Sequence, residues 1–109
     1  MLSVVVPTYM EADNLPALAQ RIDDLLSVGG HEYELLIAED HSTDATASVC
    51  QVFCGKYPMR LVLPTDRARD LPLSALDGLS AANGDEILVM DADLSHPPEM
   101  ISAMLECLR

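Results

Sequence analysis

The sequence predicts an α/β fold in which a mostly parallel four-stranded sheet carries helices on both faces. Short apolar segments, typical of strands buried on both sides, alternate with segments whose apolar residues recur every three to four positions. This alternation occurs four times along the chain, as in a parallel sheet whose strands are joined by helices. The 109 residues, half of them hydrophobic, suffice for one domain with its own core. We therefore treat residues 1–109 as a single domain.

Each predicted strand is a mainly apolar segment bounded by polar or turn-forming residues. The predicted strands cover 2–6, 33–38, 59–63 and 86–90. Pro7 is expected to end the first of them, because proline has no N–H to donate to a neighbouring strand.

Helices are predicted wherever apolar residues follow helical spacing. The predicted helices cover 15–26, 45–53, 73–82 and 97–108. Asp13 or Asn14 is expected to cap the first helix and Asp44 the second, because short polar side chains accept hydrogen bonds from free N–H groups. Pro97 or Pro98 would start the last helix, since proline is tolerated in a first helical turn.

The segment 64–72 is the longest stretch without a predicted element, and it is basic in an otherwise acidic chain. It holds Arg67 and Arg69, two of only six basic residues. One interpretation is a solvated loop, because surface arginines are common. The other is a loop whose arginines reach toward a phosphate, for which the planar guanidinium is suited. We keep both.

The formal net charge of −12 argues against non-specific binding to nucleic acid or to anionic membranes, because both attract basic residues and repel acidic ones. A phosphate ligand would need a cation to mediate its contact. The N-terminus lacks the basic region of a signal peptide, and no apolar stretch approaches the ~20 residues of a membrane-spanning helix. These features predict a soluble, cytoplasmic protein.

Polar clusters follow three of the four predicted strands. Asp91 and Asp93 come directly after the fourth strand, Glu11 follows the first, and Glu39 with Asp40 follows the second. Because parallel strands end at the same edge of a sheet, these carboxylates are expected to share one edge, where α/β proteins bind ligands. Two carboxylates one residue apart suit Mg²⁺, which keeps its other positions for water and phosphates. The sequence predicts a metal-assisted phosphate site there.

Several motifs, in a fixed order, span nearly the whole chain. They are Pro7-Thr8-Tyr9-x-Glu11, Glu39-Asp40 followed by Ser42-Thr43-Asp44, Leu71-x-x-Ser74-Ala75-x-x-x-Gly78, Ala82-x-Gly84-Asp85, and Asp91-Ala92-Asp93-Leu94-Ser95-His96-Pro97-Pro98-Glu99. In content and order they resemble the inverting family 2 glycosyltransferases. The last string is most similar to that of dolichol-phosphate (polyprenyl-phosphate) mannosyltransferases.

The resemblance implies a GT-A (Rossmann-like) fold, a three-layer sandwich of which this chain holds the N-terminal, nucleotide-sugar-binding part. It also implies transfer of a sugar, typically mannose from GDP-mannose, to a polyprenyl or dolichyl phosphate. Mg²⁺ or Mn²⁺ would assist, and a missing C-terminal part would supply any peripheral contact with the cytoplasmic face of a membrane. A nucleotide-sugar-binding remnant without transfer activity remains the alternative.

The resemblance also assigns roles to individual positions. The implied nucleoside-binding residues are Pro7, Tyr9, Glu11, Ala38, Glu39 and Asp40. Asp91, Ala92 and Asp93 would hold the diphosphate through the metal, with the two aspartates as catalytic residues and Ser95 beside the metal. Arg67 is the expected substrate-binding arginine of the loop.

Three positions depart from the pattern that these enzymes usually show. Met10 replaces an asparagine, Glu39 an aspartate and His41 a glycine. Since glycine alone lacks a Cβ, position 41 is expected to have an unusual backbone angle or a close ligand approach.

Overall fold

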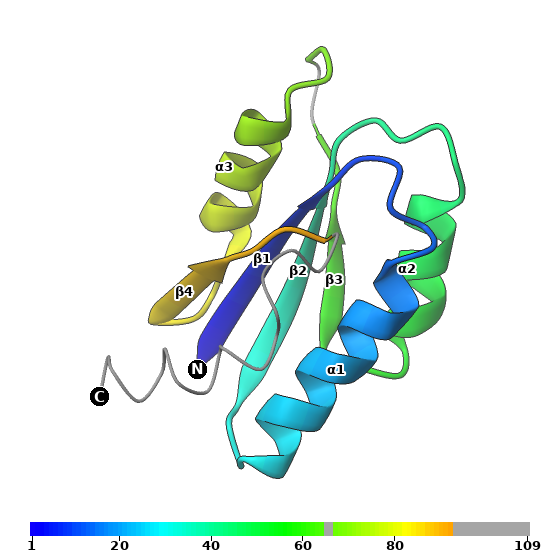
Figure 1. Ribbon diagram of the computed structural model, residues 1–109. Coiled ribbons are helices and arrows are strands. Elements are labelled where there is room, and N and C mark those ends of the chain that lie inside the picture. The colour runs from blue at the N-terminus through cyan, green and yellow to red at the C-terminus, as the bar shows by residue number, and fades with distance from the viewer. Residues whose placement is uncertain (65–66, 93–109) are drawn as a thin grey trace.

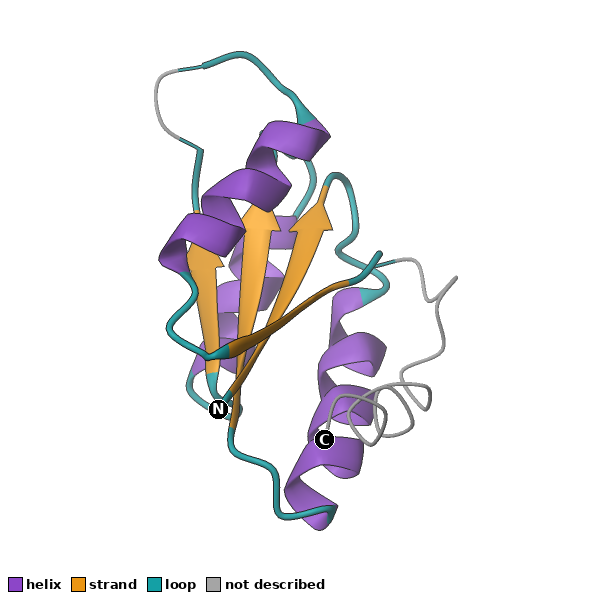
Figure 2. Ribbon diagram, turned by 90° about the vertical axis from the view of Figure 1, so that its left-hand side faces the viewer, coloured by secondary structure: helices purple, strands orange, loops and turns teal. Residues whose placement is uncertain are grey.

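The computed structural model describes residues 1–64 and 67–92, and it has the expected α/β architecture. The elements alternate along the chain: β1 Leu2–Thr8, α1 Leu15–Val28, β2 Tyr33–Glu39, α2 Thr46–Cys54, β3 Met59–Val62, α3 Leu71–Ala81 and β4 Glu86–Val89. The strands form one sheet in the order β3-β2-β1-β4, and every pairing is parallel. Figures 1 and 2 show α1 and α2 on one face of the sheet and α3 on the other. The predicted last helix lies outside the described residues.

The main core lies between the sheet and the α1–α2 layer. Alternate residues of β1 and β2 face it, among them Val4, Val6, Leu35 and Ile37, all at most 1% exposed. The opposite alternation puts the smaller cluster of Val5, Leu36 and Ala38 under α3. Both central strands are buried along their whole length, as the apolar runs predicted.

Helix α3 packs close to the sheet because its inner face carries small residues. A Cβ on Gly78 would lie 2.5 Å from Cγ1 of Val5, so only glycine fits that point of contact. Ser74, one helical turn earlier, is fully buried. The close approach brings the N-terminus of α3 to the edge of the sheet where β1 and β2 end.

We expected Pro7 to end the first strand, and this prediction is wrong. Strand β1 continues through Pro7 to Thr8, which is paired with Glu39 of β2. On its other side, β1 pairs with β4 only as far as Val5 and Val89. Among the described strands, β2 alone pairs with β1 at Pro7, which is the situation in which a strand tolerates proline.

Helix α3 begins at Leu71, two residues earlier than predicted. The side chain of Asp70 caps it by accepting a hydrogen bond from the Leu73 N–H at 3.0 Å, and Pro72 sits in the first turn. Proline is favoured there because the first N–H groups of a helix have no partner within the helix. The irregular segment after β3 therefore ends at Asp70, and not at Pro72.

The predicted helix caps are only partly right. Asn14 occupies the cap position of α1, but its side chain donates to the Glu11 carboxylate at 2.7 Å and caps nothing. Asp44 accepts the Thr46 N–H at 3.0 Å and so serves the first turn of α2, although the cap residue itself is Ala45.

Two non-glycine residues have left-handed backbone conformations among those that the structure describes. They are Met10, with φ 58°, and His41, with φ 60°. These are two of the three departures from the family pattern, and the expected unusual backbone angle at position 41 is confirmed. Asparagine and glycine both tolerate this conformation better than the residues present here.

We expect His41→Gly to raise the free energy of unfolding by about 1 kcal/mol, because glycine pays no Cβ penalty at positive φ. Urea denaturation checks this. His41→Ala is the matched control, since it removes the imidazole but keeps the Cβ. If His41→Ala stabilises as much as His41→Gly, the imidazole is responsible and backbone strain is not.

Candidate functional site

The loops that follow β1 and β2 are joined by hydrogen bonds at the carboxyl edge of the sheet. The Ser42 hydroxyl accepts the Met10 N–H at 2.7 Å, and the Thr46 hydroxyl accepts the Glu11 N–H at 2.9 Å. These bonds satisfy backbone donors that a strand end leaves without partners. The two loops therefore form one rigid rim, and Tyr9 and Glu11 are held in it.

A pocket of about 390 Å³ opens beside this rim, between the end of β1 and the start of α3. Its walls are Tyr9, Asp40, Arg69, Asp70, Leu71 and Pro72. The Arg69 guanidinium lies over the Tyr9 ring, with its central carbon 4.2 Å from the ring centroid. The pocket thus combines a guanidinium over an aromatic ring, two apolar residues and two aspartates. Pockets of this volume hold small molecules.

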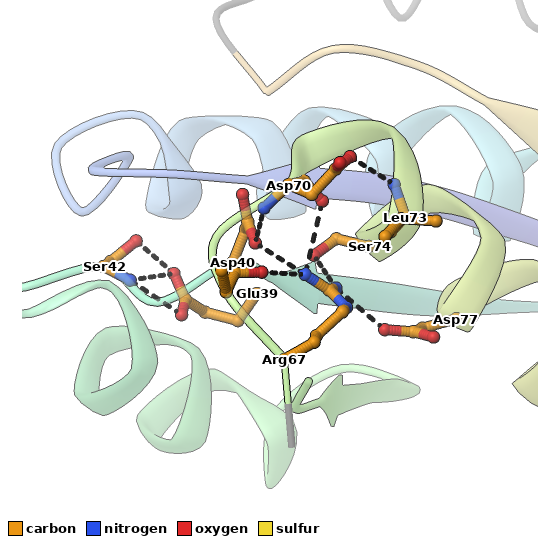
Figure 3. Close-up of polar contacts among 9 residues, drawn as sticks. Glu39, Asp40, Ser42, Arg67, Asp70, Leu73, Ser74 and Asp77 are labelled. Carbon is orange, nitrogen blue, oxygen red and sulfur yellow. Dashed lines mark hydrogen bonds and ion pairs between the residues drawn. The ribbon is translucent and has the colours of Figure 1, made fainter. Parts of the chain in front are cut away.

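Asp40 forms the floor of the site, and its carboxylate is only 1% exposed. The carboxylate oxygen Oδ1 accepts the Asp70 N–H at 2.9 Å and an Arg67 N–H at 3.2 Å. Figure 3 shows Arg67 between Asp40 on one side and Ser74 and Asp77 on the other. Arg67 donates to the Ser74 hydroxyl at 2.7 Å and to the Asp77 carboxylate at 2.9 Å.

These contacts keep Asp40 charged. Burial alone would raise the pKa of its carboxyl, but hydrogen bonds from the Asp70 N–H, Arg67 and Ser74 hold that pKa below its ordinary value. The amino end of the sheet has a second carboxylate of this kind. Burial would likewise raise the pKa of Glu34, yet bonds from Ser3, the Asn83 N–H and Arg60 lower it.

Stability should therefore fall in acid. A carboxyl whose folded pKa is depressed stabilises the fold above its unfolded pKa, and that contribution disappears as the pH falls through the folded pKa. We expect the free energy of unfolding to drop as the pH falls below about 4, near the ordinary values of 3.8 for Asp40 and 4.5 for Glu34. Urea denaturation at pH 7, 5 and 3 measures this. The cost of Asp40→Asn should shrink from pH 7 to pH 3; a constant cost would contradict the assignment.

Glu39 points away from the pocket. Consecutive residues of a strand face opposite sides, and Figure 3 shows Glu39 directed toward Ser42 while Asp40 is directed toward Arg67. Glu39 is 4% exposed, and it accepts hydrogen bonds from the Ser42 N–H, at 3.0 Å, and from the Ser42 hydroxyl. Its carboxylate orders the loop after β2.

The remaining predicted site residues lie at the same edge but differ in accessibility. Pro7, Ala38 and Ala92 are buried, so any contact they make with a ligand is through the backbone. Asp91 directly follows Met90 at the end of β4, and it is exposed. Asp93 and Ser95 lie outside the described residues.

The donor set after β4 suits a hard divalent cation. No group of three or more histidine, cysteine, aspartate or glutamate side chains gathers to hold a metal within residues 1–64 and 67–92. Mg²⁺ does not require one, because one or two carboxylates and substrate phosphates suffice for it. The exposed Asp91, with Asp93 two residues on, offers oxygen ligands only, which fits Mg²⁺ or Mn²⁺.

Sequence reasoning missed the partners that hold Arg67. Ser74 and Asp77 lie seven and ten residues beyond it, on the next helix, and Asp70 contributes its backbone N–H to Asp40. One signal was available: Ser74 is a polar residue on the helix face that must pack against the sheet, so it needs a partner there.

Comparison with known proteins agrees with this arrangement. The family model described as Glycosyl transferase family 2 matches residues 3–109. The chain belongs to this family. Its four parallel strands, with helices on both faces, are the part of the GT-A fold that this family 2 chain spans.

Two named relatives show what this family 2 chain is similar to. The chain is 39% identical over 108 residues to a dolichol-phosphate mannosyltransferase of Pyrococcus furiosus, covering 99% of this chain and 30% of that protein. It is 34% identical over 108 residues to an undecaprenyl-phosphate 4-deoxy-4-formamido-L-arabinose transferase of Klebsiella pneumoniae strain 342, covering 96% and 32%. The chain thus spans about a third of the length of these curated relatives. No helix within the described residues is long and apolar enough to cross a membrane.

Proposed function

We propose that this chain is the donor-binding part of a metal-dependent glycosyltransferase that transfers a sugar from a nucleotide donor to a polyprenyl phosphate. The observation that carries the proposal is the pocket beside Tyr9 and Asp40, at the edge of the sheet where Asp91 also lies. The names of the relatives support the class of acceptor, since they specify dolichol phosphate and undecaprenyl phosphate. GDP-mannose is the proposed donor, by analogy with the mannosyltransferase.

The residues divide the work according to their position. Tyr9 and the other pocket residues would bind the nucleoside. Asp40 would keep the pocket in shape through its bonds to Arg67 and to the Asp70 N–H. Asp91, Asp93 and Ser95 would hold Mg²⁺ or Mn²⁺. When bound, the cation supplies positive charge that stabilises the departing nucleoside diphosphate. A phosphate acceptor is already anionic at neutral pH, so its attack needs no strong base from the protein.

Calorimetric titration tests the donor. We expect GDP-mannose to bind in the presence of Mn²⁺ and to bind far more weakly after chelation, and UDP-glucose to bind less tightly than GDP-mannose. Stronger binding of UDP-glucose would refute the choice of donor. Binding of neither sugar nucleotide would refute the proposed function.

The alternative is a nucleotide-sugar-binding chain without transfer activity. Catalysis needs both reactants held in attack geometry, an effect worth up to about 7–11 kcal/mol. The 109 residues should therefore bind the donor yet transfer little mannose to a polyprenyl phosphate by themselves. Robust transfer in a radiochemical assay would eliminate this alternative.

A further inference from the structure

We propose that Arg69 recognises the nucleobase by stacking, as the second planar group of the pocket, and that it does not bind the phosphates. This inference rests on the proposed function, because it assigns a role within the same pocket. It also separates the two arginines of the loop, both of which the sequence offered as phosphate ligands.

Arg67 has its hydrogen-bonding capacity directed into the protein. Its guanidinium donates to Asp40, Ser74 and Asp77, and its side chain is 18% exposed. It also contacts the carbonyl oxygens of Ala68 and Asp70, at 3.0 and 3.4 Å. A phosphate would have to replace the ion pairs with Asp40 and Asp77 to bind it. Arg67 is therefore a positioning residue, which fixes the loop against α3 and Asp40.

Arg69 is placed differently, at the open side of the pocket. It is exposed, and its guanidinium lies over the ring of the half-buried Tyr9 at 4.2 Å from the centroid. A guanidinium is planar and weakly hydrated, so it stacks on flat groups in a way that an ammonium does not. Both side chains line the pocket, so each brings a planar group to its wall.

The rest of the pocket favours a base over a phosphate. Asp70, an exposed residue, lines the pocket, and its negative charge opposes an anion at this point. Leu71 and Pro72 supply apolar walls. A neutral planar base with N–H groups suits these walls, because its faces can stack and make apolar contacts and the Asp70 carboxylate can accept from its edge.

The stacking role predicts how different ligands and variants behave. A residue that stacks on the base should contribute equally to the affinity for GDP and to the affinity for guanosine, which has no phosphate. A residue that binds phosphate should matter only for GDP. Lysine keeps the charge at position 69 but lacks the planar group, so Arg69→Lys distinguishes stacking from simple attraction.

The experiment measures binding of GDP and guanosine, in Mg²⁺, to the wild-type chain and to Arg69→Ala, Arg69→Lys and Lys56→Ala. We expect Arg69→Ala to lower the affinity for both ligands by a similar factor of about ten. Arg69→Lys should lower both affinities almost as much. Lys56→Ala is the matched control, because Lys56 is also a cation over a tyrosine ring, 5.3 Å from the centroid of Tyr57, but lies after α2. It should leave both affinities unchanged.

Three results would overturn the proposal: unchanged affinities in Arg69→Ala, wild-type affinities in Arg69→Lys, or a loss for GDP without a loss for guanosine. Each of them leaves the proposed function standing, provided that wild-type chain binds GDP. The same measurement with UDP tests the proposed function separately: if the wild-type chain binds neither GDP nor UDP in Mg²⁺, both the proposed function and this inference are wrong.

Discussion

Arg67→Ala is expected to lower the free energy of unfolding by about 1–3 kcal/mol. Its removal leaves the Asp40 carboxylate, which is 1% exposed, without its cation, and leaving a buried acceptor without one of its donors typically costs about this much. The same substitution also takes away the hydrogen bonds to Ser74 and Asp77. Urea denaturation at pH 7 measures the change. A domain of this size is stable by only about 5–15 kcal/mol, so the effect is large.

Arg69→Ala is the matched control for this prediction. It makes the same substitution in the same loop, but at an exposed guanidinium whose described contact is the Tyr9 ring. We expect it to cost under about 1 kcal/mol. If Arg67→Ala is already unfolded without urea, Arg67→Lys is measured in its place. This variant keeps the charge, so it shows whether the loss of stability is electrostatic. Equal small losses from both alanine variants would contradict the structural role of Arg67.

Replacing Asp91 and Asp93 together by asparagine is expected to weaken GDP binding in Mn²⁺ by about 100-fold or more. The reason is that a metal held by these carboxylates would contribute several kcal/mol of attraction to the diphosphate, and each 1.4 kcal/mol is a factor of ten. Circular dichroism should show an unchanged fold, because Asp91 is exposed at the end of β4. Calorimetry with and without EDTA measures the binding.

The control for this double variant removes the same two charges elsewhere. Asp24 and Glu32 are exposed, on α1 and in the turn before β2, at the amino end of the sheet. Asp24→Asn with Glu32→Gln should leave GDP affinity within about twofold, since exposed charges a Debye length away are screened. If both double variants weaken binding equally, the net charge of the chain is responsible, and no specific metal site is needed.

The order and type of the elements could be predicted from the sequence because burial on both faces leaves a strong signal. β1 and β2 are buried at every position, so apolar residues dominate their sequences, although Ser3 and Glu34 are buried among them. The boundaries depend on contacts between distant residues and were less predictable. Pro7 stays in β1 because β4 pairs no further than Val5, and no local pattern of the sequence contains that fact.

The candidate site was predictable to the level of the strand ends but not of the individual contacts. Topology alone places Tyr9, Asp40 and Asp91 at one edge of a parallel sheet. Which of Arg67 and Arg69 faces the protein depends on the path of a loop that has no periodic pattern. Arg67 faces the protein because it bonds to Ser74 and Asp77. The positions of these two residues follow from the close packing of Gly78 on Val5.

The central claim is that a nucleoside diphosphate and a divalent cation bind together at the carboxyl edge of this sheet. A residue-resolved NMR titration of the isotope-labelled chain with GDP, first in EDTA and then in Mg²⁺, tests it most directly. The account predicts that the amide signals of Tyr9, Asp40, Asp70 and Asp91 shift together, and that they shift only when Mg²⁺ is present. Absence of any shift at saturating GDP, shifts that are the same in EDTA, or shifts confined to the amino end of the sheet would contradict it.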